Sequence, residues 1–281
     1  MTQLIQTFIS GLTLGSIYAL IALGYTMVYG IAKMLNFAHG DIIMVGAYAG
    51  IVSVLNIGLP PLFAILASLV VCALLGILIE RFAYKPLRTA EPLSVLITAI
   101  GVSYLLQNLA LLIFGSQQMA FPAIITKEIY KLGGIEIDNI TIMTLAVTAA
   151  IMIGLTVFIA KSKLGKAMRA VSEDKGAAQL MGINVNRTIT LTFAIGSALA
   201  AVASTFYGMT YMYIKPTTGS MPGIKAFTAA VFGGILLGVI EQFSKTYIST
   251  LWTDAIVFGV LVVVLIVKPT GILGKKTREK V

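Results

Sequence analysis

The stretch Ser162–Arg187, SKLGKAMRAVSEDKGAAQLMGINVNR, is the longest charged interruption between two apolar runs that are each long enough to cross a bilayer. Four of its residues before the last are lysine or arginine, and the last is arginine. A basic loop in this position predicts a surface that faces the cytoplasm and is bound there by a partner protein.

The second half of this loop predicts one short helix with both ends marked. Ser172 is expected to cap its N-terminus, and Glu173 and Asp174 place negative charge in the first turn. Gly182 supplies the left-handed position that commonly ends a helix, and Ile183 is the apolar residue expected to fold back onto the last turn. The loop therefore combines a defined helix with a basic, solvent-facing surface.

The composition of the chain indicates a protein that crosses the membrane several times. Of its 281 residues, 58% are hydrophobic and only 11% are charged, and the mean hydropathy is +0.97. The average soluble domain has about 25% charged residues, so this chain has too little polar surface for a water-soluble globule. The N-terminal apolar run lacks a basic region before it and a cleavage site after it, so we expect the first span itself to direct insertion.

The net charge of +9 reflects membrane topology rather than nucleic-acid binding. Fourteen of the 20 basic residues lie in Arg81–Arg88, Lys161–Arg187 and Lys268–Lys280, which the positive-inside rule places in the cytoplasm. The single cysteine, Cys72, lies in an apolar run and excludes both a disulfide framework and a thiol metal site.

The apolar runs predict an all-α polytopic membrane protein with seven to eight transmembrane helices, forming one domain over residues 1–281. The weaker segment 223–240 is expected to be a re-entrant hairpin, because the basic loops then all fall on one side and the nearly neutral loop 115–139 falls outside. The same count places the N-terminus outside unless one early segment is broken. The expected spans are 4–31, 42–57, 62–79, 92–114, 140–160, 188–214 and 255–267.

Small residues recur at the spacing that lets membrane helices pack closely. Three G-x-x-x-G pairs predict such contacts within a tightly packed bundle or at a subunit interface. They are Gly11 and Gly15, Gly46 and Gly50, and Gly234 and Gly238.

A polar segment separates the first two spans. Asn36, His39 and Asp41 lie beside apolar helices, with Gly30 and Gly40 as possible breaks. One interpretation is a short solvated turn in which His39 caps a helix. The other is a discontinuous helix whose free N–H groups face a translocation pathway, with Asn36, His39, Gly40 and Asp41 as its residues.

Motifs for catalysis are missing from the sequence. The chain has one histidine, no G-x-S-x-G nucleophile elbow and no G-x-x-x-x-G-K-[ST] phosphate-binding loop. We therefore expect a protein that is not an enzyme, and any energy from nucleotide hydrolysis must enter through a separate subunit.

Several stretches together carry a family resemblance: GLTLGSIYALIALGYTMVYG (11–30), NFAHGD (36–41), ERFAYKPLR (80–88), RAVSEDKGAAQLMGIN (169–184), GIKAFTAAVFGGI (223–235) and KPTGILG (268–274). They resemble the permease subunits of bacterial branched-chain amino acid ABC importers, and most closely the first of the two paired permeases. The resemblance covers nearly the whole chain.

The resemblance implies a heteromeric importer in the bacterial inner membrane. In such importers two permeases form the pathway, two ATPase subunits bind the ATP and Mg²⁺, and a periplasmic binding protein delivers the substrate. This chain would bind no cofactor itself. Loop 162–187 would be the coupling loop, residues 268–281 a basic cytoplasmic tail, and the ATPase-coupling residues Glu173, Asp174, Ala177, Ala178, Gly182, Ile183 and Asn184.

Two departures from the family pattern stand out. Gly176 occupies the place of the glutamate in the E-A-A-x-x-x-G coupling pattern. At Ile235–Leu236 the sequence lacks a short glycine- and proline-containing stretch expected at the tip of the hairpin, through either a deletion or an incomplete sequence.

Other functions stay open at this point. Related permeases carry urea, amides or other amino acids. A secondary transporter or channel acting alone would need carboxylates inside its spans, whereas Asp41, Glu80, Glu241 and Asp254 are all expected near span ends. A structural membrane anchor would need no pathway residues. The amides of Gln107 and Asn108 are expected to hydrogen-bond between helices.

Overall fold

The computed structural model describes residues 2–132, 134–228 and 231–267, so the predicted basic tail 268–281 lies outside the described residues. The helices are α1 (Thr2–Ala32), α2 (His39–Leu55), α3 (Pro61–Ile79), α4 (Pro92–Phe114), α5 (Asn139–Lys161), α6 (Lys163–Glu173), α7 (Lys175–Leu180), α8 (Val185–Tyr211), α9 (Ser220–Thr228), α10 (Val231–Tyr247) and α11 (Thr253–Val267). A π-helical turn (Glu80–Tyr84) and a 3₁₀ turn (Lys85–Leu87) extend α3. The short strands are β1 (Met119–Ala120), β2 (Ile129–Leu132), β3 (Ile135–Asp138) and β4 (Tyr213–Ile214).

The helices confirm the predicted all-α polytopic membrane fold. Among the described residues, five helices are apolar and long enough to cross a bilayer: α1, α3 with its extension, α4, α5 and α8. The helices α2 and α11 are apolar but shorter. Observed and predicted spans agree within a few residues at most ends, partly because Pro61 and Pro92 each begin a helix at the first position, where proline is tolerated.

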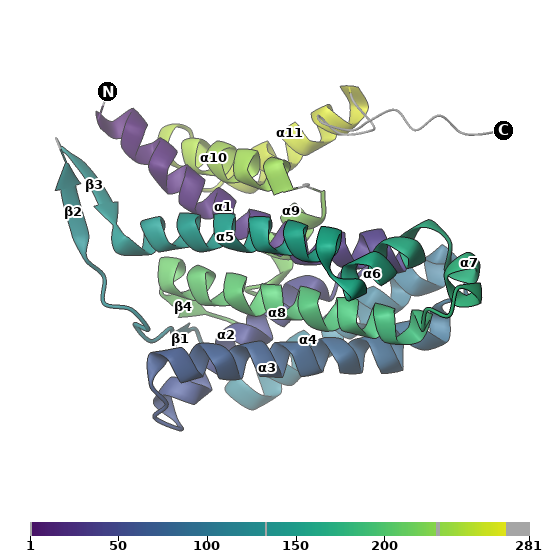
Figure 1. The fold of residues 1–281 in the computed structure, drawn as a ribbon. Coiled ribbons are helices and arrows are strands. Elements are labelled where there is room, and N and C mark those ends of the chain that lie inside the picture. Colours follow the sequence, from purple (N-terminus) through teal and green to yellow (C-terminus); the bar gives the residue numbers. More distant parts are fainter. Residues whose placement is uncertain (1, 133, 229–230, 268–281) are drawn as a thin grey trace.

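The bundle has two distinct ends, which we call outer and inner. At the outer end, Gln6 near the start of α1 exchanges two hydrogen bonds with the backbone of Glu136 in β3, at 2.6 and 3.0 Å. At the inner end, Lys175 of α7 donates a 3.1 Å hydrogen bond to the carbonyl of Ala32, the last residue of α1. Figure 1 shows β2, β3 and the start of α1 at the left, and α6 and α7 at the right. The helix α1 therefore starts at the end that carries loop 115–139, in agreement with the topology count.

Helix α1 lies at the centre of the bundle. In its most apolar window 72% of the residues are buried, against 11% for α4 and for α5. The outward faces of α4 and α5 carry large, exposed apolar side chains such as Leu112, Ile113 and Ile153. Exposing such apolar surface to water is unfavourable, so these faces suit contact with lipid or with another membrane subunit.

Two of the predicted glycine pairs pack against each other. A Cβ on Gly11 would lie 2.8 Å from the Cα of Val239, and one on Gly234 would lie 2.9 Å from the backbone nitrogen of Ala19. Between these contacts the backbones of Gly15 and Gly238 touch. Helices α1 and α10 thus run antiparallel at close approach, which only glycine permits at these positions.

The segment 223–240 is re-entrant, as predicted, but its shape differs from the expected one. After α8 the chain reaches the outer end, where β4 pairs with β1. Helix α9 then returns into the bundle, and α10 runs back along α1 until Tyr247 lies near Leu4. Ile235 and Leu236 lie inside α10. Where a hairpin tip was expected, the helix is continuous, because Gly234 and Gly238 on either side of the junction pack closely against the backbone of α1.

Candidate functional site

The inner end presents α7 as a short, capped helix. Its N-cap is Asp174, whose carboxylate accepts hydrogen bonds from the backbone nitrogens of Gly176 (2.7 Å) and Ala177 (3.0 Å). The prediction that Ser172 caps this helix is wrong, because Ser172 lies inside α6 and its hydroxyl donates to the carbonyl of Arg169. Glu173 ends α6 rather than standing in the first turn of α7.

The predicted C-terminal stop of α7 is confirmed. Gly182 has a φ of 79°, and its N–H bonds to the carbonyl of Gln179 at 3.0 Å. The N–H of Ile183 bonds to the carbonyl of Ala178, also at 3.0 Å. This pair of bonds is the Schellman arrangement, which satisfies carbonyls that the helix end leaves free. Immediately after it, Asn184 caps α8 through Arg187.

Two large apolar side chains are exposed where α7 ends. Leu180 and Met181 are 90% and 82% exposed, while Ala178 on the other side is buried. Two large apolar side chains presented by a rigid turn are unfavourable in water and suit burial by a partner.

The platform beneath α7 is held by polar contacts. Lys175 reaches α1 at Ala32, and its pKa is lowered by burial and then by the nearby charges of Arg88 and Lys33. The buried carboxylate of Glu80 accepts hydrogen bonds from Arg88 and, at 2.7 Å, from Thr190 of α8. At the inner end, α7 is thus bonded to α1, and the extension of α3 is bonded to α8.

The break between α1 and α2 is buried, so the interpretation as a solvated turn is wrong. Lys33 has a left-handed φ of 57°. The side-chain oxygen of Asn36 accepts a 3.0 Å hydrogen bond from the Tyr84 hydroxyl, and its backbone nitrogen donates to Tyr25. His39 begins α2 without acting as its cap; its ring lies against Gly24 and edge-on to Tyr25 at 6.0 Å.

The N-terminal ends of α2 and α9 meet beside this segment. The backbone of Gly40 in α2 touches those of Gly219 and Gly223, next to and inside α9. Gln107 of α4 joins them by donating to Asp41 and to Ser220, each at 3.0 Å. The predicted interhelical role of Gln107 is confirmed, whereas the side chain of Asn108, among the residues that the structure describes, bonds to the carbonyl of Tyr104 in its own helix. The pathway roles of Asn36, His39, Gly40 and Asp41 stay predictions.

A buried ion network lies between α1, α9, α10 and α11, and sequence reasoning missed it. The carboxylate of Glu241 is bonded by Lys225, by Lys245 and by the Tyr18 hydroxyl, at 2.7, 2.7 and 2.8 Å. Lys225 also pairs with Asp254 at 2.8 Å. The expectation that Glu241 lies near a span end is wrong, because it is 3% exposed inside α10. Three charges in one weakly apolar segment, at 225, 241 and 245, were the available signal.

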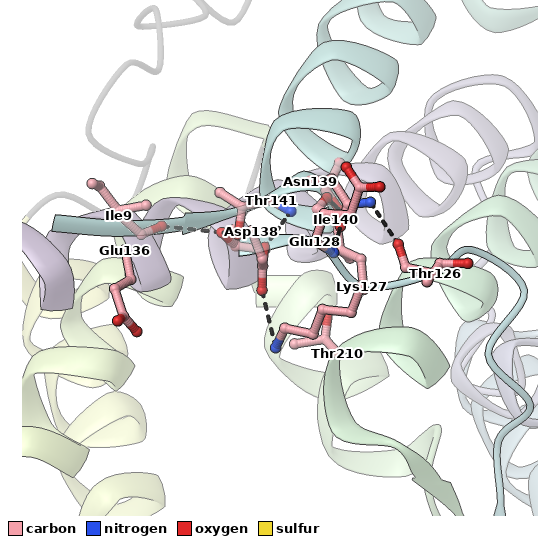
Figure 2. Close-up of polar contacts among 12 residues, drawn as sticks. Ile9, Thr126, Lys127, Glu128, Glu136, Asp138, Asn139, Ile140, Thr141 and Thr210 are labelled. Carbon is pink, nitrogen blue, oxygen red and sulfur yellow. Dashed lines mark hydrogen bonds and ion pairs between the residues drawn. The ribbon is translucent and has the colours of Figure 1, made fainter. Parts of the chain in front are cut away.

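A pocket of about 330 Å³ opens beside this network toward the outer end. It lies between α1, α5, α8 and α10, and the extended segment before α5 forms its rim. Its lining includes Ser10, Thr13, Lys127, Asp138, Tyr211 and Lys245. Figure 2 shows Lys127 extended toward Thr210 and paired with Asp138.

Comparison with known proteins identifies the family. A family model described as "Branched-chain amino acid transport system / permease component" matches residues 7–267. The high-affinity branched-chain amino acid transport system permease protein BraD of Pseudomonas aeruginosa is 44% identical over 300 residues, covering 99% of this chain and 98% of the relative. LivH of Escherichia coli K12, described in the same words, is 43% identical over 99% of this chain and 97% of its own length.

A more distant relative is named for a different substrate. The fructose import permease protein FruG of Bifidobacterium longum is 24% identical over 89% of this chain and 81% of its own length. No solved structure matches the chain. The alignment with BraD extends over 300 residues, more than the 281 residues of this chain. The chain is a multi-pass protein of the inner membrane and belongs to the family of permease components of branched-chain amino acid transport systems.

Proposed function

We propose that this chain is the permease subunit of an ATP-driven importer of branched-chain amino acids. It would form the translocation pathway with a second permease, receive its substrate from a periplasmic binding protein and be driven by two ATPase subunits. The observation that carries the proposal is α7, a rigidly capped helix that presents Leu180 and Met181 at the inner end. The near full-length similarity to BraD and LivH supports the choice of substrate.

The construction of α7 supports the proposal that coupling passes through this helix. An ATPase that holds Leu180 and Met181 moves a helix whose two ends are fixed by Asp174 and by the turn at Gly182. Because Lys175 connects α7 to the end of α1, such a movement is passed into the centre of the bundle. The chain needs no nucleotide site of its own for this role.

Gly182→Val is expected to uncouple ATP hydrolysis from uptake. Valine is strongly disfavoured at a positive φ, and strain of about 1–3 kcal/mol would unwind the turn that fixes the end of α7. Uptake of labelled leucine by vesicles containing the complete importer should fall by about tenfold or more, since about 1.4 kcal/mol corresponds to a factor of ten, while ATP hydrolysis continues. Unlabelled isoleucine and valine should compete with leucine, and urea should not.

The matched control is Gly154→Val in α5, where a Cβ would meet no atom within 4 Å. It should import leucine at the parent rate. Unchanged uptake by a normally expressed Gly182→Val importer would contradict the coupling role, and competition by urea would contradict the proposed substrate.

Leu180→Asp is expected to weaken the association with the ATPase subunits. A charge in the middle of an apolar contact must be desolvated without a partner, which costs several kcal/mol. The ATPase should no longer copurify with the permease in detergent. The same change at Leu251, which is 93% exposed near the outer end, should leave copurification intact. Equal retention of the ATPase by both variants would exclude α7 as the docking site.

A second candidate, a secondary transporter that acts alone, is favoured by one observation, the buried carboxylate of Glu241. Its three bonding partners disfavour a proton-carrying role, because two of them are lysines that hold it in the charged form. Reconstitution of the purified chain alone tests this candidate: gradient-driven uptake of leucine without ATPase subunits would favour it over the proposed function.

A further inference from the structure

The pocket at the outer end has polar walls within an apolar bundle. Hydroxyl groups come from Ser10 and Thr13 of α1 and from Thr210 and Tyr211 of α8. Polar residues at membrane depth are costly unless they face each other or a water-filled cavity, where they often mark a substrate path. A volume of about 330 Å³ lies at the small end of the range for small-molecule sites.

One wall of the pocket carries a partly exposed carboxylate. Asp138 uses one oxygen to cap α5, accepting from the backbone nitrogen of Thr141 at 2.7 Å. Its other oxygen faces Lys127 at 3.2 Å (Figure 2). Burial alone would raise the pKa of Asp138, but the hydrogen bonds from Thr141 and the charge of Lys127 outweigh burial and hold the pKa below its ordinary value. The carboxylate is therefore ionised at neutral pH.

Another wall carries the ammonium group of Lys245, whose ion-pair partner Glu241 has further bonding partners. The side chain of Lys245 lines the pocket, is 27% exposed and bonds to Glu241 at 2.7 Å. Glu241 is also bonded by Lys225 and Tyr18 through its second oxygen. If Lys245 turns toward a ligand in the pocket, Glu241 keeps a cation and a hydroxyl donor, so no buried charge is left alone.

We propose that this pocket is an outer binding site for an α-amino acid in its zwitterionic form. The ligand carboxylate would pair with Lys245, its ammonium with Asp138, and its side chain would contact Leu14, Ile140 and Met209. This proposal rests on the proposed function and assigns the substrate a first site within this one permease, between the outer end and the buried network at Glu241.

The charge pattern selects this class of ligand over others. An inorganic anion would pair with Lys245 but would leave Asp138 with Lys127 as its one cation in the pocket. A sugar would offer a counter-charge to neither Lys245 nor Asp138. A zwitterion supplies one opposite charge to each wall, and the apolar contacts favour an aliphatic side chain.

Cysteine labelling with a membrane-impermeant, charged methanethiosulfonate reagent tests the site in the complete importer without its binding protein. Ser10→Cys and Thr210→Cys place a thiol on two different walls, and Ser116→Cys places one on the exposed loop outside the pocket. The natural Cys72 is fully buried, so the parent importer gives the background level of labelling for this chain. All three variants should be labelled from outside.

Leucine should slow the labelling of Ser10→Cys and Thr210→Cys by about tenfold at ten times its dissociation constant, because only the empty pocket reacts. It should not affect Ser116→Cys, and sodium acetate should protect none of them. Labelling of the pocket thiols that leucine leaves unchanged, or no labelling of them while Ser116→Cys reacts, would overturn the site.

A second measurement separates this inference from the proposed function. In Ser10→Cys combined with Lys245→Gln, protection should require a several-fold higher leucine concentration; unchanged protection would overturn the assignment of Lys245 to the carboxylate. If the parent importer takes up leucine but leucine does not protect the pocket thiols, the site alone is wrong. If the parent takes up no branched-chain amino acid, the proposed function is wrong.

Discussion

Gly238→Ala is expected to destabilise the whole bundle, although it adds only one methyl group. The new Cβ would overlap the backbone of Gly15, and backbone atoms in the middle of a helix cannot give way as a flexible side chain can. Helices α1 and α10 would have to separate along their full contact. The expected cost is about 3 kcal/mol, the upper part of the usual range for overpacking.

The measurement is the midpoint of thermal unfolding in detergent, followed by size-exclusion chromatography. A cost of about 3 kcal/mol should lower the midpoint by roughly 6–12 °C for a chain of this size. The matched control is Gly101→Ala in α4, where a Cβ would meet no atom within 4 Å and alanine has the higher helix propensity. Equal midpoints for the two variants would show that α1 and α10 do not touch at these glycines.

Glu241→Gln is expected to have an effect of similar or larger size. It removes the anion shared by two lysines, so Lys245 loses its ion pair and the buried Lys225 keeps, among the described ion pairs, only the one with Asp254. Breaking a buried ion pair on one side costs about 3–5 kcal/mol. The free energy of unfolding should fall by that amount. Glu136→Gln provides the control, because its ion pair with Lys131 at 2.8 Å is exposed on both sides and such pairs contribute about 0–1 kcal/mol.

A double variant tests whether charge balance is the cause. With Lys245→Met added to Glu241→Gln, the remaining Lys225 still pairs with Asp254, so part of the lost stability should return. A double variant no more stable than Glu241→Gln alone would indicate that packing around residue 241, rather than the unpaired cation, determines the loss.

The spans and the helix stop were predictable because each depends on a local signal. A bilayer of fixed thickness requires about 20 apolar residues, which gave most helix ends to within a few residues. Gly182 is recognisable because a left-handed position after a helix favours glycine over other residues. The spacing of Gly11 and Gly15, and of Gly234 and Gly238, predicted close helix packing, but only the structure shows that these two pairs meet each other.

The errors arose where tertiary contacts decide between local alternatives. Ser172 and Asp174 are both good capping residues, and the burial of Met168 and Val171 keeps α6 helical past Ser172, so the cap falls on Asp174. The polar segment at Asn36 looks like a solvated turn until Tyr25 and Tyr84 cover it. The partners Lys225 and Glu241 are 16 residues apart on two helices, so no helical spacing reveals the pair.

The length of α1 has a mechanical consequence. Its 31 residues form one helix without an interruption, which spans about 46 Å at 1.5 Å per residue. Its inner end is bonded to α7. Its outer half forms one wall of the proposed amino-acid pocket and packs against α10. A continuous helix without a kink transmits a displacement of one end to the other. In the proposed importer, a push of the ATPase on α7 would thus arrive at the opposite face of the membrane as a tilt of the pocket wall, together with a movement of α10.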